Sequence, residues 1–546
     1  METKRVKSGD DFAETCASII SGAITVFIVL LVTVFPLIYH DSYFDILETK
    51  YQCYYICVIG MLAVCLVLAV IMAVIDAKEF QGNHVMKILE GLAPKNWKRT
   101  FSLADAGVIV FWLVALISTL QSDYLFEAFW GNEGRYTGLF LLTLYVAAYF
   151  LISRCWKMRR WCLDLFLLSG MVMCFIGITD YFQLDILDFR GMIKPEQSTI
   201  FTSTIGNINT YTAYVGLIMG FAAGMFAVEK KLWKLIWYFV CMVVSFYAII
   251  MGCSDNAYLA IAALFGLIPF IMFRTREGVK RYLIMLAAFF TVVWTIDLIN
   301  VKFADMVIGL DSLFRVMVNF GGLIFLVIAL WAVVLAFGFY EKKLEKAGNS
   351  AGESDGGWGR KLVRAWGVAV LIGVAGLIFM IFDANVGGHA ARYGALGSYL
   401  VFDDSWGTNR GYIWKEAMRL YGEFPVMHKL FGYGPDTFGI LTVNEIHFEM
   451  VNKTGQVFDS AHNEYLQYLI TIGPIGLAAY LVFLVASFRA MLKMSKKNVC
   501  LTGMLVALVC YAFQAVVNIN LPMATPIMWL MLSAGMAAVK GADCQF

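Results

Sequence analysis

Long apolar segments alternate with short polar segments along the whole chain of 546 residues. A helix that crosses a bilayer needs about 20 consecutive, mostly apolar residues. The segments that meet this requirement are residues 17–39, 53–75, 105–121, 137–153, 161–180, 209–228, 235–253, 257–273, 282–299, 318–339, 366–383, 463–487, 499–518 and 526–540. The pattern therefore predicts an all-α fold, a polytopic membrane helix bundle of about 14 transmembrane helices with one large extracytoplasmic loop.

The distribution of lysine and arginine predicts which loops face the cytoplasm, because cytoplasmic loops are enriched in both residues. Basic residues gather in the loops at 78–99, 154–160, 230–234, 274–281, 342–364 and 489–497, and also at the N-terminus. Both termini are then cytoplasmic, and residues 384–461 form the extracytoplasmic loop. We expect four regions, which are residues 1–104 (helices 1–2 and a cytoplasmic linker), 105–383 (helices 3–11), 384–461 (the large loop) and 462–546 (helices 12–14).

The amino-acid composition excludes several classes of function. Hydrophobic residues make up 60% of the chain and charged residues 15%, and the mean hydropathy is +0.73, which excludes a soluble enzyme. The formal net charge of +2 implies no nucleic-acid partner. The 12 cysteines lie mostly in apolar segments without metal-binding spacing, so we interpret them as small buried hydrophobic residues.

The large loop contains patterns of ordered structure. Residues Ile413, Trp414, Ala417 and Met418 have the spacing of an amphipathic helix, and residues 432–436 read Gly-Tyr-Gly-Pro-Asp, which is typical of a tight turn. By contrast, residues 348–357 are rich in glycine and serine, as in a flexible linker.

The large loop meets the next apolar segment at His462 and Asn463. A continuous helix from this point places residues spaced by three or four on one face: His462, Leu466, Leu469, Gly473, Gly476 and Tyr480. Pro474 cannot donate a hydrogen bond to Ile470, so we expect a kink there. His462 is either an ordinary interfacial residue or, at neutral pH, a group that accepts a proton from a hydroxyl.

Three other outward segments combine glycine or asparagine with a cation or an aromatic ring. They contain Arg135 in residues 129–138, Asn207 in residues 203–209, and Arg410 with Trp414 in residues 407–414. An arginine at the membrane surface is often only an anchor, but its planar fork also binds phosphate bidentately. Metal binding by Asp403 and Asp404 is the weaker interpretation, because adjacent loop carboxylates are usually solvated. We therefore expect no metal, and without a nucleotide motif we expect no cofactor.

Together these residues resemble the superfamily of O-antigen ligases and O-antigen polymerases. Its pattern of His, then Asn, Ser or Gln, nine residues, Gly, two residues, and Gly, Thr or Tyr fits His462, Asn463, Gly473 and Gly476. The loop segment from Arg410 to Phe438 looks like the same superfamily, and residues 131–138 and 206–209 resemble segments that recur in it. The resemblance covers about residues 125–540, while the N-terminal helices 1 and 2 lie outside it.

The resemblance implies a multi-pass glycosyltransferase of the bacterial plasma (inner) membrane with its active site on the extracytoplasmic side. The implied donor is a polyprenyl-diphosphate-linked oligosaccharide, and the acceptor is a sugar hydroxyl of a lipid-linked glycan, lipid A-core or a protein glycan. His462 matches the family's proposed base and Arg410 the arginine proposed to act on the diphosphate. Arg135 is a looser match, and we expect it to bind substrate with Asn207, Trp414 and Asn463. Direct displacement without a metal predicts inversion at the anomeric carbon.

The sequence leaves ligase, polymerase and protein-glycan ligase open. A transporter or flippase of lipid-linked oligosaccharides is the alternative class, and a non-catalytic assembly partner is a weaker one. Transporters usually carry internal repeats and ionisable residues at the membrane midplane. Here the polar cluster lies in the long loop, which favours an enzyme.

Overall fold

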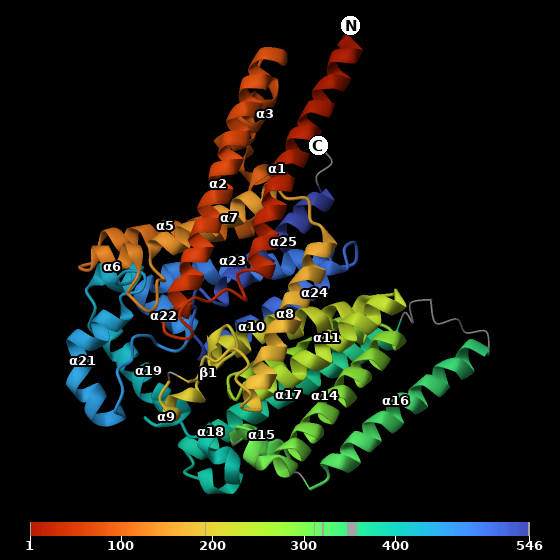
Figure 1. The fold of residues 1–546 in the computed structure, drawn as a ribbon, viewed down its shortest axis with the longest axis vertical. Coiled ribbons are helices and arrows are strands. Elements are labelled where there is room, and N and C mark those ends of the chain that lie inside the picture. The colour runs from red at the N-terminus through yellow and green to blue at the C-terminus, as the bar shows by residue number, and fades with distance from the viewer. Residues whose placement is uncertain (1, 192, 311, 319–320, 347–356, 544–546) are drawn as a thin grey trace. The chain divides into compact units, whose positions relative to one another are not determined.

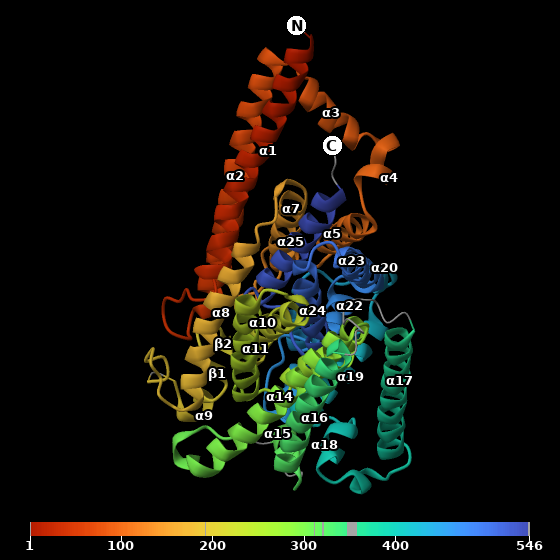
Figure 2. The ribbon, with the colours of Figure 1, turned by 90° about the vertical axis from the view of Figure 1, so that its right-hand side faces the viewer.

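The computed structural model describes residues 2–191, 193–310, 312–318, 321–346 and 357–543, so residues 348–356 of the expected linker lie outside it. Contacts divide the chain into two compact units. The first unit contains residues 1–169, 420–501 and 519–546, and the second contains residues 170–419 and 502–518. The large loop is thereby shared between the units at residue 419. Figures 1 and 2 show the helices that make up each unit.

In the first unit, every described element of regular secondary structure is a helix. Its elements are α1 (Glu2–Thr33), α2 (Ile46–Glu79), α3 (Asn83–Leu92), the 3₁₀ turn η1 (Pro94–Asn96), α4 (Trp97–Thr100), α5 (Leu103–Leu120), α6 (Leu125–Trp130), α7 (Leu139–Cys155), α20 (Val426–Phe431), α21 (Phe438–Thr454), α22 (Glu464–Thr471), α23 (Gly473–Met494) and α25 (Thr525–Asp543). Helix α23 packs along α5, α25 along α7, and α1 along α2. A Cβ atom on Gly107 would lie 2.9 Å from the backbone nitrogen of Phe483, so α5 and α23 are in backbone contact there.

The second unit is also helical apart from one small hairpin. Its elements are α9 (Pro195–Ser198), the antiparallel strands β1 (Phe201–Thr202) and β2 (Gly206–Asn207), α10 (Ile208–Val228), α11 (Leu232–Met251), α12 (Ala257–Leu267), α13 (Pro269–Met272), α14 (Arg276–Lys302), η2 (Ala304–Met306), α15 (Ser312–Val318), α16 (Leu323–Lys346), α17 (Trp358–Asn385), η3 (Ala390–Leu396), α18 (Gly397–Leu400) and η4 (Ala515–Val517). Three helices belong to both units: α8 (Arg160–Tyr181), α19 (Trp406–Glu423) and α24 (Cys500–Gln514). Helix α10 is central, because every residue from Thr210 to Phe226 is buried.

The structure confirms an all-α, polytopic membrane protein. Among the described residues, 11 helices are long and apolar enough to cross a membrane, and shorter apolar helices lie at Leu139–Cys155 and Ala257–Met272. The expected total of about fourteen spans and the side of each loop stay predictions. Helix α17 has no buried residue in its most apolar window, so its sides are free to face lipid.

The first span is shorter than the apolar pattern predicts. Helix α1 ends at Thr33, whereas the pattern continues to residue 39. Beyond the helix, the buried ammonium of Lys50 donates hydrogen bonds to the carbonyls of Phe35, Pro36 and Ile38 at 2.9, 3.1 and 3.0 Å. Pro36 lacks an N–H group and cannot continue the helix, so a side chain of α2 satisfies the carbonyls that are left over.

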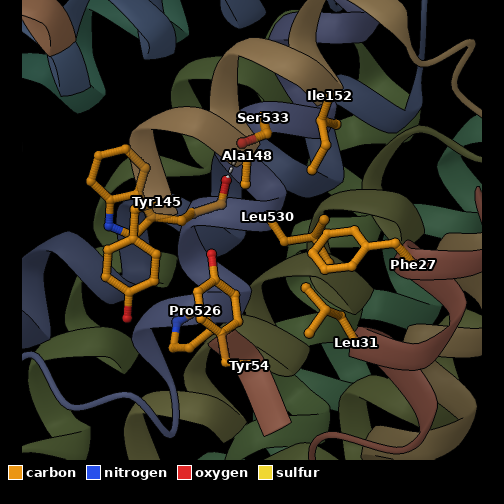
Figure 3. Close-up of a pocket in the computed structure, with 10 residues that line it drawn as sticks. Phe27, Leu31, Tyr54, Tyr145, Ala148, Ile152, Pro526, Leu530 and Ser533 are labelled. Carbon is orange, nitrogen blue, oxygen red and sulfur yellow. Dashed lines mark hydrogen bonds between the residues drawn. The ribbon is translucent and has the colours of Figure 1, made fainter. Parts of the chain in front are cut away.

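A small cavity lies in the core of the first unit, between α1, α2, α7 and α25 (Figure 3). The volume open to water is about 10 Å³, which is about the room that one water molecule needs. Aromatic and aliphatic side chains line it, including Phe27, Tyr54, Tyr145 and Trp529. This cavity is too small for a glycan or a lipid chain.

Candidate functional site

The first part of the candidate site is the junction between the large loop and α22. Helix α22 begins at Glu464, and Asn463 is its N-cap: the Asn463 side chain accepts hydrogen bonds from the backbone N–H groups of Tyr465 and Leu466, both at 3.0 Å. His462 precedes the cap with a left-handed φ of 47°. The prediction that His462 shares a helix face with Leu466 is therefore wrong, because the capping conformation turns the chain before the helix starts.

The expected kink at Pro474 is a complete break in the helix. Helix α22 ends at Thr471, Gly473 has a φ of 75°, and α23 starts with Pro474 in its first turn. Pro474 has no N–H group for the carbonyl of Ile470, and this carbonyl accepts a hydrogen bond from the N–H of Tyr433 at 3.1 Å. The carbonyl of Thr471 similarly accepts one from the N–H of Gly434 at 2.9 Å.

The Gly-Tyr-Gly-Pro-Asp turn is thus bound to the helix break. Gly432 and Gly434 have φ values of 79° and 117°, which confirms the turn that the sequence predicts. A Cβ atom on Gly432 would lie 2.3 Å from the nitrogen of Ile472, and one on Gly473 would lie 2.3 Å from the carbonyl oxygen of Leu430. The two backbones touch, so the turn has a fixed position against the start of α23.

Asp436, at the end of this turn, holds the loop that contains Arg135. Its side chain is 4% exposed and accepts hydrogen bonds from the N–H groups of Asn132 and Thr137 at 2.7 and 3.0 Å. Burial raises the pKa of the Asp436 carboxyl to about 6, and the two N–H groups oppose this shift. The Asn132 side chain also donates to the carbonyl of Asp436.

Arg135 forms an ion pair with Asp459, which lies close to His462 in the sequence. The Arg135 Nε atom is 2.9 Å from Asp459 Oδ2, and its Nη2 atom donates to the other carboxylate oxygen. The Arg135 side chain is 15% exposed and that of Asp459 is 52% exposed. The first unit therefore brings Arg135 to the segment that carries His462 and Asn463, with a carboxylate already bound to the arginine.

Arg410 lies in the second unit, in a strained turn at the start of α19. Gly407, Thr408 and Asn409 all have left-handed φ values, of 60°, 61° and 66°. This conformation costs about 1–2 kcal/mol for each residue with a side chain and is rare for a β-branched residue such as Thr408. Strain of this kind often occurs at functional sites.

The surroundings of Arg410 leave its charge without a carboxylate partner. Its Nη1 atom donates to the carbonyl of Gly407 at 3.1 Å, while its buried Nε atom has no hydrogen-bond partner among the described residues. No carboxylate of the described chain lies within ion-pair distance of it. Burial lowers the pKa of the Arg410 guanidinium, and the charge of Asp255 opposes this shift. The guanidinium thus retains capacity to bind an anion.

Asp255 is a residue of this region that the sequence interpretation missed. It lies in the turn between α11 and α12, and the hydroxyl of Tyr399 donates to its carboxylate at 2.8 Å. The neighbouring Ser254 and Asn256 side chains donate to the Asn209 side-chain oxygen at 2.7 and 3.0 Å. A polar turn between two apolar segments was the available signal for this cluster.

Asn207 and Trp414, which the sequence predicts to bind substrate, both contact other residues of the second unit. Asn207 is the N-cap of α10 and accepts a hydrogen bond from the N–H of Asn209 at 2.9 Å. The Trp414 ring lies 5.2 Å from that of Trp406 and 6.1 Å from that of Phe402, measured between ring centroids. The helix predicted around Trp414 is confirmed as α19.

The acidic pair that could bind a metal has other partners. Asp403 accepts hydrogen bonds from the hydroxyl and the N–H of Ser405, at 2.8 and 3.0 Å, and Asp404 forms an ion pair with Lys415 at 2.8 Å. Hydrogen bonding to Ser405 lowers the pKa of Asp403. In the described part of the chain, no group of three or more His, Cys, Asp or Glu residues has the arrangement of a metal site.

The described chain is thus an α-helical membrane protein whose loop segments carry Arg135, Arg410 and His462. Residues 310–481 match the family model of the O-antigen ligases, Wzy_C. The matched segment contains Arg410, Trp414, His462 and Asn463, so the resemblance to the O-antigen ligase and polymerase superfamily is confirmed. This match supports a membrane function in glycan transfer for cell-surface polysaccharide synthesis, with a lipid-linked glycan as substrate. No curated protein matches the chain.

Proposed function

We propose that the protein is a glycosyltransferase that moves a glycan from a polyprenyl diphosphate to a sugar hydroxyl on the extracytoplasmic side of the membrane. The observation that carries this proposal is the environment of Arg410 inside the matched segment. Its guanidinium lies in a strained turn, has an unpartnered Nε atom among the described residues, and has no carboxylate ligand. A diphosphate supplies the oxygen atoms that such a group lacks.

The role of Arg410 is to stabilise the leaving group. As the bond between the anomeric carbon and the diphosphate oxygen breaks, negative charge grows on the diphosphate. A guanidinium held in a partly buried turn stabilises this charge more than the charge of the intact donor, because the dielectric constant is low there. The polyprenyl diphosphate then leaves with the electron pair of the broken bond.

His462 is the base in this proposal. The acceptor hydroxyl attacks the anomeric carbon from the side opposite the diphosphate, and a neutral ring nitrogen of His462 takes its proton. The new glycosidic bond therefore has the inverted configuration. The rigid surroundings of His462 support this role, since Asn463 caps α22 and Phe458 packs edge-on to the histidine ring with a centroid distance of 5.8 Å.

The decisive experiment measures donor binding and single-turnover transfer for Arg410 variants of the full-length protein in nanodiscs. With a lipid-linked glycan as donor, Arg410→Ala should lower the transfer rate by about 10²–10³-fold. Arg410→Lys should lie between Arg410→Ala and the native protein, because lysine keeps the charge but loses the bidentate fork.

Arg419 provides the matched control on the same helix. Its side chain is 45% exposed and its Nε atom pairs with Glu416 at 2.7 Å, so Arg419→Ala should transfer normally. Normal donor binding and turnover in both Arg410 variants, at equal folded fraction, would show that Arg410 only supports the loop.

A further inference from the structure

Helix α3 has separate apolar and polar faces. At 100° per residue, its apolar side chains all fall on one side of the helix, which carries Val85, Met86, Ile88, Leu89 and Leu92. The opposite side carries Asn83, His84, Lys87, Glu90 and Gly91. This separation is typical of helices that lie at a boundary between water and an apolar phase.

No part of the described chain covers the apolar face. No residue of α3 is buried, and Met86, Ile88, Leu89 and Leu92 are 58%, 66%, 56% and 51% exposed. Trp97, in the following helix α4, is 55% exposed. Adjacent apolar side chains of this size require a covering layer in water.

The beginning of α3 is fixed at the end of a membrane span. The apolar segment of α2 ends before Asp76, whose carboxylate accepts hydrogen bonds from the N–H groups of His84 and Val85 at 3.1 and 3.0 Å. The same carboxylate pairs with the His84 ring at 2.5 Å. Helix α3 is therefore anchored to the residue that directly follows the apolar segment of α2.

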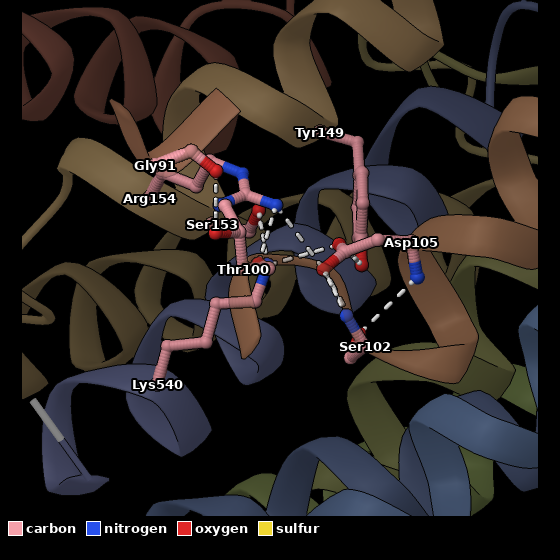
Figure 4. A network of polar contacts seen from close by, with 8 residues as sticks. All are labelled: Gly91, Thr100, Ser102, Asp105, Tyr149, Ser153, Arg154 and Lys540. Atoms are coloured by element: carbon pink, nitrogen blue, oxygen red, sulfur yellow. Dashed lines mark hydrogen bonds and ion pairs between the residues drawn. The ribbon is translucent and has the colours of Figure 1, made fainter. Parts of the chain in front are cut away.

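The other end of α3 is tied to the start of the next span (Figure 4). The Thr100 hydroxyl donates to the carbonyl of Gly91 at 2.7 Å, and Arg154 donates to the carbonyl of Thr100 at 3.2 Å. Arg154 also pairs with Asp105, near the start of α5, which Lys540 contacts at 2.9 Å. Both ends of α3 are thus held beside the ends of two candidate membrane spans, α2 and α5.

The charges around α3 complement an anionic surface. Residues 83–100 contain four basic residues, Lys87, Lys95, Lys98 and Arg99, and one acidic residue, Glu90. All four basic side chains are exposed, and none has an ion-pair partner within the described ranges. The positive-inside pattern predicts that this segment faces the cytoplasmic leaflet, where anionic lipids attract such clusters.

We propose that residues 83–100 form a surface that binds anionic phospholipids of the cytoplasmic leaflet. The apolar face of α3 lies at the boundary of headgroups and acyl chains, with Trp97 at the same level. The basic residues contact the lipid phosphates. This surface is independent of glycan transfer and of Arg410 and His462.

The test places one fluorescent label on each face of α3 in the full-length protein. Leu89→Cys labels the apolar face and Lys87→Cys the polar face, in a cysteine-light background reconstituted in nanodiscs of phosphatidylcholine with phosphatidylglycerol. Doxyl-labelled lipid should quench the Leu89→Cys label at least about three-fold more than the Lys87→Cys label, and aqueous acrylamide should show the reverse order.

A charge variant tests the lipid preference. Replacing phosphatidylglycerol by phosphatidylcholine, or adding about 0.5 M NaCl, should reduce doxyl quenching of the Leu89→Cys label. The triple variant Lys87→Gln, Lys95→Gln, Lys98→Gln should lose this dependence, whereas Lys230→Gln, Lys231→Gln, Lys234→Gln in another basic loop should keep it.

Two results would overturn the proposal. Equal acrylamide quenching of both labels would show that the apolar face lies in water. Protection of the Leu89→Cys label from both quenchers would show that protein covers it, and a change in mass with concentration would then identify a second copy of the chain.

Discussion

Arg135 in the first unit and Arg410 in the second lie beside similar glycine- and asparagine-rich segments, yet the protein compensates their charges differently. Arg135 binds both oxygens of Asp459, whereas Arg410 contacts a backbone carbonyl and has no carboxylate ligand among the described residues. A phosphate must compete with Asp459 for Arg135 but has no such competitor at Arg410. An arginine in such a segment therefore does not by itself identify an anion-binding site, because the groups already bound to the arginine determine whether it can bind an anion.

The largest effect should come from His462, which supplies a function that neither arginine can replace. We expect His462→Ala to lower transfer by about 10²–10⁴-fold, the usual contribution of a general base. Donor binding should stay nearly normal, because Arg410 is intact. Single-turnover transfer and donor binding in nanodiscs measure the two quantities separately. Near-normal turnover in His462→Ala would remove this residue from the mechanism.

Substitutions in the Arg135–Asp459 pair should have a smaller effect, on donor affinity. They test whether Asp459 limits the binding of phosphate to Arg135. An ion pair at this exposure stabilises by about 1 kcal/mol at most, so displacing it weakens binding by about five-fold. If Arg135 contacts the diphosphate, Asp459→Asn should tighten donor binding by up to this factor, and Arg135→Ala should weaken it less than Arg410→Ala does.

Donor titrations of these variants at equal folded fraction provide the measurement. Unchanged donor affinity in both Asp459→Asn and Arg135→Ala would show that the pair is only a structural link in the first unit.

Asp436 should affect stability rather than transfer, because it holds the Arg135 loop without facing an anion. Its folded pKa of about 6 lies above the usual 3.8, so the folded state binds the proton more tightly. The protonated Asp436 side chain contributes at most about 3 kcal/mol to the free energy of unfolding. This contribution is complete below about pH 4 and is lost as the pH rises through about 6.

Thermal unfolding in nanodiscs at pH 5 and pH 8 tests this sign. Asp436→Asn should reduce the difference in midpoint between the two pH values, since its side-chain oxygen still accepts from Asn132 and Thr137. Asp436→Ala should lower both midpoints, because two N–H groups lose their acceptor. The raised pKa of Asp436 would be contradicted if the midpoint of the native protein rose from pH 5 to pH 8 and the midpoint of Asp436→Asn rose by the same amount.

The smallest expected effect is that of a chelator. In our proposal Arg410 supplies the charge that stabilises the diphosphate, and Asp403 and Asp404 are engaged by Ser405 and Lys415. Transfer should therefore be unchanged in EDTA. Loss of activity that Mg²⁺ or Mn²⁺ restores would transfer the main electrostatic role from Arg410 to a metal.

Local patterns predicted most of the fold. Apolar segments, amphipathic spacing in α19 and the turn at residues 432–436 depend on neighbours in the sequence, and the structure confirms all three features. The ion pair of Arg135 with Asp459 joins positions 324 residues apart, and no local pattern encodes such a contact. The roles of His462 and Arg410 stay predictions, although the family match includes both residues.

The break between α22 and α23 also depends on a contact that no local sequence pattern encodes. Glycine and proline at positions 473 and 474 predict a kink, but a full break needs other donors for the carbonyls that are released. Those donors are the N–H groups of Tyr433 and Gly434, about forty residues earlier in the chain. The sequence alone shows the proline, but it does not show which N–H groups bind the released carbonyls.

Because Pro474 releases the Ile470 carbonyl and the turn at 432–434 binds it, each segment depends on the other for its backbone conformation. A substitution that placed an N–H group at position 474 would bring a second donor to this carbonyl, and we expect the requirement for Gly432 to weaken. A lineage that lost Gly432 would in turn favour a continuous helix. Among descendants of a common ancestor, we therefore expect changes at positions 432, 473 and 474 to occur together, and chimaeras that exchange only one of the two segments to misfold.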